Sequence, residues 1–254
     1  MTKIYYFSGT GNTLWSAKKL SELIGGETEL INIGMAIQKD DKVLEADAII
    51  LLFPSYAYGA PIIVNRFVRQ AVFKTGYIAV FVTYGSAQGG ALAEIGRILK
   101  RKKTGPVFFG RIPSVENYIP IFGVQKKQTI ERRLLLQKKS TDEAAHSVIN
   151  RRTNRINTFR PISAFISFLF SLGIKIFRKW YRVSDECNGC GVCEKTCPVS
   201  AIIIQNKRPV FGDKCQHCNG CLNWCPRQAI QFGRIKAETP RYHHPEINIT
   251  EISR

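Results

Sequence analysis

Short apolar runs alternate with amphipathic stretches over the first 110 residues of the chain. The runs have the length of buried strands, and the stretches between them place apolar side chains at helical spacing. This alternation is typical of a parallel sheet with crossover helices, an α/β fold with a doubly wound five-stranded sheet. We predict strands at residues 3–7, 28–33, 48–53, 78–83 and 106–109, and helices at 13–24, 61–71 and 90–100.

Residues 124–183 are predicted to form a helical connector. A first helix is expected at 124–139, and Ser140 or Thr141 then caps a second helix, with Glu143 placed for a capping box. The apolar stripe of that second helix is Ala144, Ala145, Val148, Ile149 and Ile156.

A third helix at 162–180 is the most apolar part of the connector. Its run from Pro161 to Phe177 is about 17 residues, at the short edge of what spans a bilayer. We favour a buried helix that docks one domain onto another. The alternative is an interfacial helix at a membrane surface, between the cations Arg160, Lys175, Arg178 and Lys179.

The net charge of the 254-residue chain is +18, and the connector carries most of it. Residues 111–183 hold 15 basic and 4 acidic side chains, against 13 and 8 in residues 1–110. Such a surface favours an acidic partner protein or an anionic membrane. No groove-reading motif accompanies the charge, so no nucleic-acid partner is expected.

All eight cysteines lie between Cys187 and Cys225, in two ladders offset by 28 residues at every rung. Each ladder has gaps of two, two and three residues, and a proline follows its fourth cysteine. This is the spacing of bacterial [4Fe–4S] ligands. Zinc sites lack the third cysteine at the same step, and a disulfide framework needs an oxidising compartment. We predict two [4Fe–4S] clusters, electron transfer, and a cytoplasmic location because the chain opens without a secretory apolar region.

Residues 184–235 resemble the bacterial two-cluster ferredoxins, in the ladders and in the short apolar strands that begin at Ala201 and Ala229. In that family the fourth cysteine of each run ligates the other cluster. The resemblance implies one cluster on Cys187, Cys190, Cys193 and Cys225, and a second on Cys215, Cys218, Cys221 and Cys197. We expect His217, inside the second ladder, to be an exposed loop residue, and His146, His243 and His244 to lie at the surface.

Three loops follow predicted strands at the sheet edge where such folds bind ligands. The loop at 8–13 opens a helix and offers hydroxyls and backbone N–H groups without a lysine, which favours a single phosphomonoester. The loops at 54–61 and 83–90 place tyrosines beside glycines, so rings can flank a planar ligand. The candidate cofactor-binding residues are Ser8, Thr10, Gly11, Asn12, Thr13, Pro54, Ser55, Tyr56, Tyr58, Gly59, Thr83, Tyr84, Gly85, Gly89 and Gly90.

A further segment, residues 111–123, should pass near the same edge. Asn117 and Tyr118 are candidate substrate or cofactor contacts within it, and a solvated loop is the alternative.

Residues 1–115 resemble flavodoxin. The first loop matches its phosphate loop at Ser8, Thr10, Asn12 and Thr13, and the other two correspond to the loops that bracket the isoalloxazine ring. The resemblance implies bound FMN, although flavodoxins are usually acidic and this region is basic. Together the two resemblances indicate the flavodoxin–ferredoxin fusion proteins of anaerobic bacteria and archaea, whose activity is generally redox.

We therefore expect a flavodoxin-like FMN domain at 1–123, a basic helical connector at 124–183, and a small α+β two-cluster ferredoxin-like domain with a C-terminal tail at 184–254. The expected function is electron transfer within the chain, as an oxidoreductase or electron carrier. A low-potential donor would reduce the clusters, and FMN would pass electrons to a small-molecule or acidic protein acceptor. The alternative is a redox shuttle that docks on a partner or membrane and turns over no small molecule.

Overall fold

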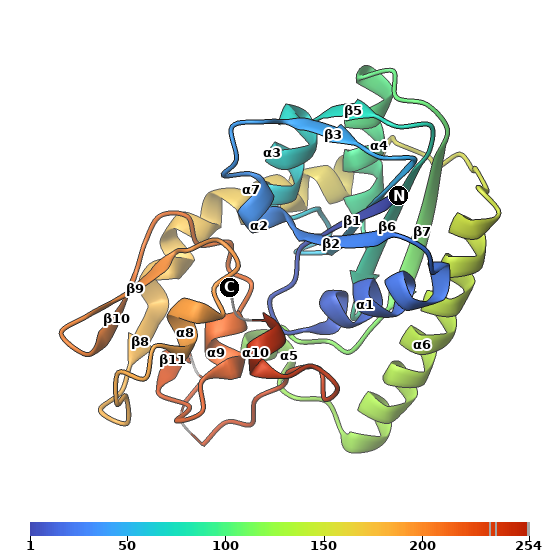
Figure 1. Cartoon of the computed structure of the whole chain (residues 1–254). Helices are drawn as coiled ribbons and strands as arrows, with labels where there is room; N and C mark the ends of the chain where they lie inside the picture. The colour runs from blue at the N-terminus through green and yellow to red at the C-terminus, as the bar shows by residue number, and fades with distance from the viewer. Residues whose placement is uncertain (234, 237, 253–254) are drawn as a thin grey trace.

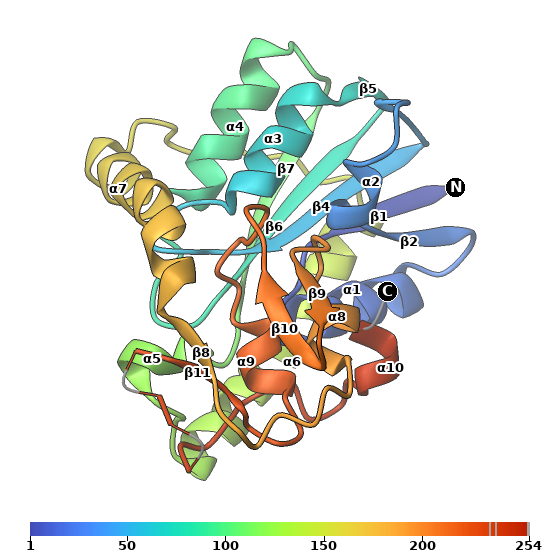
Figure 2. The ribbon, with the colours of Figure 1, turned by 90° about the vertical axis from the view of Figure 1, so that its left-hand side faces the viewer.

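The computed structural model describes residues 1–233, 235–236 and 238–252, apart from the side chain of Lys175. Figure 1 shows a twisted sheet with helices on both faces and a smaller lobe beside the sheet edge. The N-terminus lies at the far end of the sheet from this lobe, and the described C-terminal residues return to the sheet domain (Figures 1 and 2).

The sheet has five parallel strands in the order β2-β1-β4-β6-β7. Their bounds are β1 Thr2–Tyr6, β2 Thr28–Asn32, β4 Ala48–Pro54, β6 Ile78–Tyr84 and β7 Val107–Pro113. This is the strand order of flavodoxin-like folds, which confirms the predicted fold class. β4 and β6 are buried on both faces, as a sheet covered on both sides requires. β7 continues four residues beyond its predicted end.

Two helices cover each face of the sheet. α1 (Asn12–Ile24) and α6 (Lys127–Ile149) pack over Ile4, Ile50 and Phe81 on one face. α3 (Ile62–Gln70) and α4 (Ala91–Arg101) pack over the other. The sequence did not predict the short helix α2 (Ile33–Ala36) or the parallel strand pair β3 (Val43–Glu45) and β5 (Val72–Lys74).

The prediction of two helices across residues 124–149 is wrong, because α6 is continuous. Thr141 is fully buried, and its hydroxyl donates to the Gln137 carbonyl one turn earlier, so it does not cap a new helix. The Gln137 side chain donates to the Asn12 carbonyl and to Ser16 Oγ, which binds α6 to α1. Ile156 lies beyond α6 in an extended segment, packed near Gly96 of α4.

Helix α7 (Pro161–Phe177) and a 3₁₀ turn at Arg178–Trp180 form the predicted third helix of the connector. Figure 2 shows α7 along one side of the molecule, next to α4, with the short helix α5 (Ile119–Phe122) below it on the same side. Among the described residues, no helix has the length and apolar character needed to cross a membrane.

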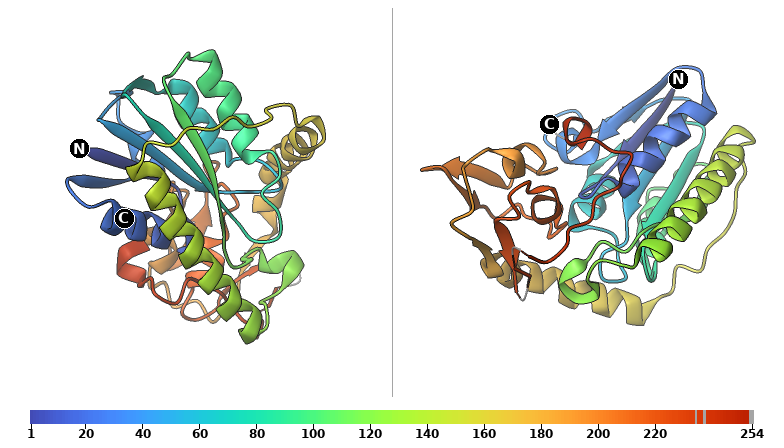
Figure 3. Two further views of the ribbon diagram at one scale, coloured as in Figure 1. Left: turned by 90° about the vertical axis from the view of Figure 1, so that its right-hand side faces the viewer. Right: turned by 90° about the horizontal axis from the view of Figure 1, so that it is seen from below.

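The small lobe is α+β, as expected. Strand β8 (Tyr181–Val183) pairs antiparallel with β11 (Ile230–Phe232), and β9 (Ile202–Gln205) pairs with β10 (Arg208–Phe211). A short helix contains the third cysteine of each ladder: α8 (Val192–Lys195) contains Cys193, and α9 (Gly220–Trp224) contains Cys221. The last described helix, α10 (Ile249–Ile252), lies against α1 (Figure 3).

Candidate functional site

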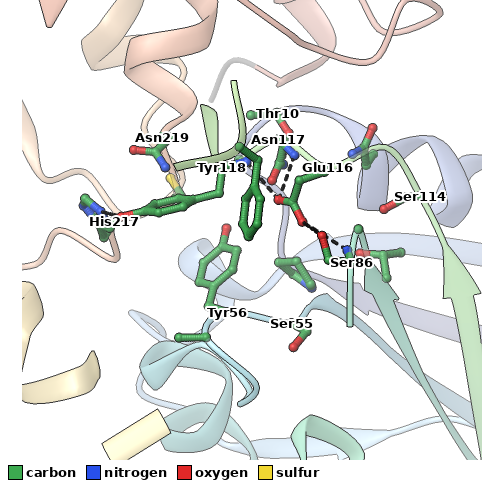
Figure 4. Close-up of a pocket in the computed structure, with 18 of the residues that line it drawn as sticks. Thr10, Ser55, Tyr56, Ser86, Ser114, Glu116, Asn117, Tyr118, His217 and Asn219 are labelled. Atoms are coloured by element: carbon green, nitrogen blue, oxygen red, sulfur yellow. Dashed lines mark hydrogen bonds between the residues drawn. The ribbon is translucent and has the colours of Figure 1, made fainter. Parts of the chain in front are cut away.

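A cavity of about 330 Å³ lies where β1, β4, β6 and β7 end, between the sheet domain and the small lobe. It falls within the usual volume range of cofactor pockets. Of the predicted cofactor-binding residues, ten line it: Ser8, Thr10, Asn12, Thr13, Pro54, Ser55, Tyr56, Tyr58, Thr83 and Gly85. Figure 4 shows its centre, with Tyr56 and Ser55 on one side and Thr10, Glu116 and Tyr118 on the other.

The loop before α1 has the features of a phosphate site. Ser8 is 2% exposed, and its hydroxyl has no hydrogen-bond partner within the described residues. Helix α1 has no side-chain cap, and Gly11 before it is left-handed at φ 95°. An uncapped helix N-terminus with an unpaired buried hydroxyl beside it suits a phosphate group.

Two predicted phosphate contacts have other partners. Asn12 donates from Nδ2 to the Val115 carbonyl (2.9 Å) and accepts at Oδ1 from the Tyr242 hydroxyl (2.8 Å). The Thr13 and Thr83 hydroxyls are 2.7 Å apart and bond each other. Both residues line the cavity, but these bonds join the loop to its surroundings.

The second loop makes a tight turn that presents two tyrosines differently. The backbones of Tyr56 and Gly59 exchange two hydrogen bonds, with Ala57 and Tyr58 left-handed between them. Tyr56 packs edge-on against Phe7, and burial raises its pKa well above the ordinary value. Tyr58 is 46% exposed at the rim. One ring therefore forms a wall of the cavity and the other its edge.

Five predicted residues do not line the cavity: Gly11, Gly59, Tyr84, Gly89 and Gly90. Three of these glycines allow close packing instead. A Cβ on Gly59 would collide with Ser167 of α7, one on Gly89 with Tyr58, and one on Gly90 would lie 2.9 Å from Ser163 Cβ. The glycines of these loops hold α7 and the loops close together.

The segment after β7 forms a wall that the sequence indicated only at Asn117 and Tyr118, and both residues line the cavity. Glu116 connects this segment to the third loop. One carboxylate oxygen accepts from the Ser86 backbone N–H (3.1 Å) and hydroxyl (3.0 Å), and the other from the N–H groups of Asn117 and Tyr118. Asn117 in turn donates to Thr10 Oγ1. Glu116 carried no motif that would have singled it out.

Part of the second cysteine ladder also lines this cavity: His217, Cys218 and Asn219. His217 is 2% exposed, so its prediction as an exposed residue is wrong. Its Nε2 lies 2.9 Å from the Tyr118 hydroxyl, as Figure 4 shows, and its Nδ1 lies 3.3 Å from the Tyr181 hydroxyl. Burial lowers the pKa of His217 to about 4 and raises that of Tyr118 to about 12, so both groups are neutral near pH 7.

The loop at residues 8–13, which we call the phosphate-site loop, packs directly on the second ladder. A Cβ built on Gly9 would stand 2.8 Å from the Cys218 carbonyl oxygen and 3.2 Å from its Sγ. A Cβ on Gly220 would stand 2.8 Å from the Gly9 carbonyl oxygen, which also accepts from Trp224 Nε1 at 3.0 Å. The two backbones meet closely enough that only glycine fits on either side.

The eight cysteines surround two smaller cavities. One is lined by Cys187, Cys190, Cys193 and Cys225, and the other by Cys215, Cys218, Cys221 and Cys197. Backbone N–H groups donate to sulfur at the second cavity, from Ala201 to Cys197 (3.2 Å) and from His217 to Cys215 (3.4 Å). No group of cysteine, histidine or acidic side chains in the described residues is spaced for a single metal ion. A cluster is larger than an ion and keeps its four ligands farther apart, so four-thiol cavities suit it better.

Residues 239–252, which we call the strap, run back from the small lobe to the phosphate-site loop. The Tyr242 N–H donates to Asn223 of α9 and its hydroxyl to Asn12, while the His244 N–H donates to the Thr10 carbonyl. His243 stacks on Trp224, and Lys18 of α1 pairs with Glu251. His244 is 1% exposed, so its surface prediction is wrong, whereas His146 and His243 are exposed.

Comparisons with known proteins found one matching family and several similar solved structures. Residues 181–203 match the 4Fe-4S binding domain family. Similar solved structures include a flavodoxin from Streptococcus pneumoniae TIGR4 (16% identity, 56% of this chain, 98% of that chain, TM-score 0.35). Another is the two-electron reduced flavodoxin of Megasphaera elsdenii (17% identity, 57% of this chain, 99% of that chain, TM-score 0.36). A third is an azoreductase from Bacillus anthracis (10% identity, 59% of this chain, 100% of that chain, TM-score 0.39). No curated protein matches.

The chain thus joins a flavodoxin-like domain to a 4Fe–4S binding domain, the combination that the sequence predicted. The family match supports a [4Fe–4S] cluster and a redox electron-transfer role.

Proposed function

We propose that the large cavity holds FMN, that the two cysteine ladders hold two [4Fe–4S] clusters with crossed ligands, and that electrons pass within the chain between the second cluster and the flavin. The protein then acts as a flavin-dependent reductase or as an electron carrier in anaerobic metabolism. Bound FMN supplies the conversion between one- and two-electron transfer. The clusters supply single electrons from a low-potential donor.

One observation carries this proposal: Cys218 lines both the large cavity and the cavity of the second ladder. A ligand sulfur at the boundary of two cofactor sites leaves no intervening layer of protein. The crossed assignment is supported by the cavities, because each contains three cysteines of one ladder and the fourth of the other.

The residues of the chain have separate parts in this scheme. Ser8 and the N-terminus of α1 would bind the phosphate, and Tyr56 and Tyr58 would flank the flavin ring. Glu116 fixes the far wall by its four hydrogen bonds. Neutral His217 and Tyr118 close the side next to the second ladder without adding charge.

Anaerobic reconstitution tests the cofactor content. We expect about eight irons, about eight acid-labile sulfides and one flavin per chain. Fewer than about six irons would contradict two clusters, and chromatography that finds no FMN would contradict the assignment of the large cavity.

A screen of acceptors against the photoreduced holoprotein separates a reductase from a shuttle. Reoxidation by small molecules such as quinones, enoates or tetrapyrroles supports the reductase. Reoxidation by protein acceptors alone supports a shuttle that turns over no small molecule.

A further inference from the structure

Helix α7 presents a stripe of large apolar side chains to solvent. Its exposed fractions run from 50% at Leu169 to 76% at Ile162. At 3.6 residues per turn, the five positions of the stripe fall within a face about 80° wide. We call these residues the outer stripe: Ile162, Phe165, Leu169, Leu172 and Ile176.

The opposite face of α7 contacts the rest of the protein. Ser163 and Ser167 pack on the close-approach glycines Gly90 and Gly59, and Ile174 is 7% exposed. Phe170 and Phe177 line the large cavity. The inner face therefore attaches α7 to the rest of the protein. The prediction of a buried helix is wrong, because the outer stripe is exposed to solvent.

The outer stripe is continuous with the mouth of the large cavity. Ile166, next to the stripe on α7, lines the cavity and is 37% exposed. On α5, Ile121 and Phe122 also line it and are 72% and 55% exposed. Figure 2 shows α5 and α7 on the same side of the molecule. Exposed apolar side chains thus border the opening and extend away from it along α7, which marks an interaction surface.

The charge of the segment that carries α7 has one sign. From Ala144 to Ser184 the chain has eight arginines and lysines and no acidic residue. Arg178 pairs with Asp213, whereas Arg160 and Lys179, at the two ends of α7, are exposed, as is Lys126 just after α5. A second copy of this chain docked on the outer stripe would bring like charges together. Anionic lipid headgroups would complement them, and apolar side chains flanked by cations are the pattern of interfacial helices.

We propose that the outer stripe, with Ile121 and Phe122, docks on an anionic membrane surface and turns the cavity mouth toward the lipid. The helix lies in the plane of the interface, since α7 is only 17 residues long and no described helix is suited to cross the membrane. This docking does not depend on the electron path proposed above.

The orientation also selects the acceptor, and this step rests on the proposed function. A planar, lipid-dissolved quinone would enter the cavity from the membrane between α5 and α7. It takes two electrons and two protons and leaves as the quinol, while the reduced flavin gives up two electrons and two protons and returns to FMN. The low-potential donor restores the electrons through the clusters, and water supplies the protons.

Vesicle flotation of the anaerobic holoprotein tests the docking. We expect flotation with vesicles that contain phosphatidylglycerol and weaker flotation with phosphatidylcholine alone or at high salt. The double variant Phe165→Ser/Leu169→Ser should lower the bound fraction at least about tenfold, because each side chain contributes apolar burial. The matched control is Leu135→Ser on α6, 70% exposed and away from the surface, which should float as the wild type does.

Three results would overturn the docking: no flotation with anionic vesicles, an equal loss in the control, or a dimer in sedimentation equilibrium that the double variant dissociates. Iron content, flavin content and circular dichroism of each variant exclude misfolding.

Reoxidation of the photoreduced holoprotein tests the acceptor. A long-tailed quinone in anionic vesicles should be reduced more slowly by the double variant than by the wild type, and a short-tailed, water-soluble quinone equally by both. Equal rates with the long-tailed quinone would overturn the acceptor step. Failure with both quinones in a protein that still floats would contradict the quinone acceptor and leave the docking intact.

Discussion

The two cysteine ladders have left-handed residues at equivalent positions but differ in their surroundings. Left-handed residues occur at the same rungs of both, 28 positions apart: Gly189 and Gly191 in the first, His217 and Asn219 in the second. In the first ladder Cys190 is exposed. In the second, Cys218 lies against the large cavity and the phosphate-site loop. The same cysteine spacing therefore places the first ladder toward solvent and the second ladder toward the large cavity.

The residues at those rungs give the second ladder contacts with the rest of the protein that the first ladder lacks. A left-handed residue other than glycine costs about 1 kcal/mol or more, so glycine is the easier choice. His217 and Asn219 are left-handed despite this cost, and their side chains make contacts that glycine could not make. His217 meets Tyr118 across the large cavity, and Asn219 accepts from the Tyr181 hydroxyl at 2.7 Å. The repeat fixes the backbone, and the side chains at its strained positions fit one half to the flavin domain.

Removal of one ligand from each ladder should have the largest effect. Cys190→Ala and Cys218→Ala should each lower the iron content from about eight to about four per chain. Cys218→Ala should also abolish flavin reduction through the clusters. Cys190→Ala should retain flavin reduction by those electrons that a donor delivers directly to the second cluster. Iron analysis and anaerobic stopped-flow absorbance measure both. Full-rate flavin reduction in Cys218→Ala would remove the distinction between the ladders.

The strap, which contacts α9, β11 and the sheet domain, should release on acidification. Burial lowers the pKa of His244 to about 4, against about 6.5 in the unfolded chain. Its contribution to stability is complete above about pH 6.5 and is lost as the pH falls toward 4, about 3 kcal/mol over the window. The protection factors of residues 240–252 against hydrogen exchange should therefore fall between pH 6.5 and 4. His244→Gln should lack this part of the pH dependence, and an identical profile in the variant would contradict it.

A glycine exchange tests the strained rungs with a smaller effect. His217→Gly relieves the left-handed backbone but removes a buried ring, for a net loss of about 2 kcal/mol in unfolding free energy and about tenfold in FMN affinity. The reciprocal Gly189→His in the first ladder should disturb iron binding alone, since its Cβ would stand 2.9 Å from the Lys207 carbonyl oxygen. Denaturation and flavin titration measure these effects. Unchanged FMN affinity in His217→Gly would show that its side chain does not serve the cavity.

The strands, the edge loops and the ladders could be predicted from sequence because each depends on local spacing. Apolar runs of strand length gave β1, β4 and β6 within one or two residues of their observed ends. Asn12 shows the limit of this approach. Its place in the loop was predictable, but its partners Val115 and Tyr242 come from distant parts of the chain.

The strap and the burial of His217 escaped prediction for the same physical reason. Residues 239–252 have no periodic pattern, and their anchors on Thr10 and Asn223 exist only once the small lobe has docked. His217 looked like a loop residue because nothing local reveals the five aromatic rings that surround it. Interfaces between domains depend on contacts that sequence spacing does not encode.

The rate of flavin reduction after rapid reduction of the clusters tests the central claim most directly. For transfer within the chain through Cys218, the rate should be independent of protein concentration and slower in Gly9→Ala, whose new Cβ would press on the Cys218 carbonyl, 2.8 Å away. Gly105→Ala, with its nearest contact at 4.0 Å, should match the wild type. A rate that rises in proportion to protein concentration, or one equal in Gly9→Ala and the wild type, would contradict the account.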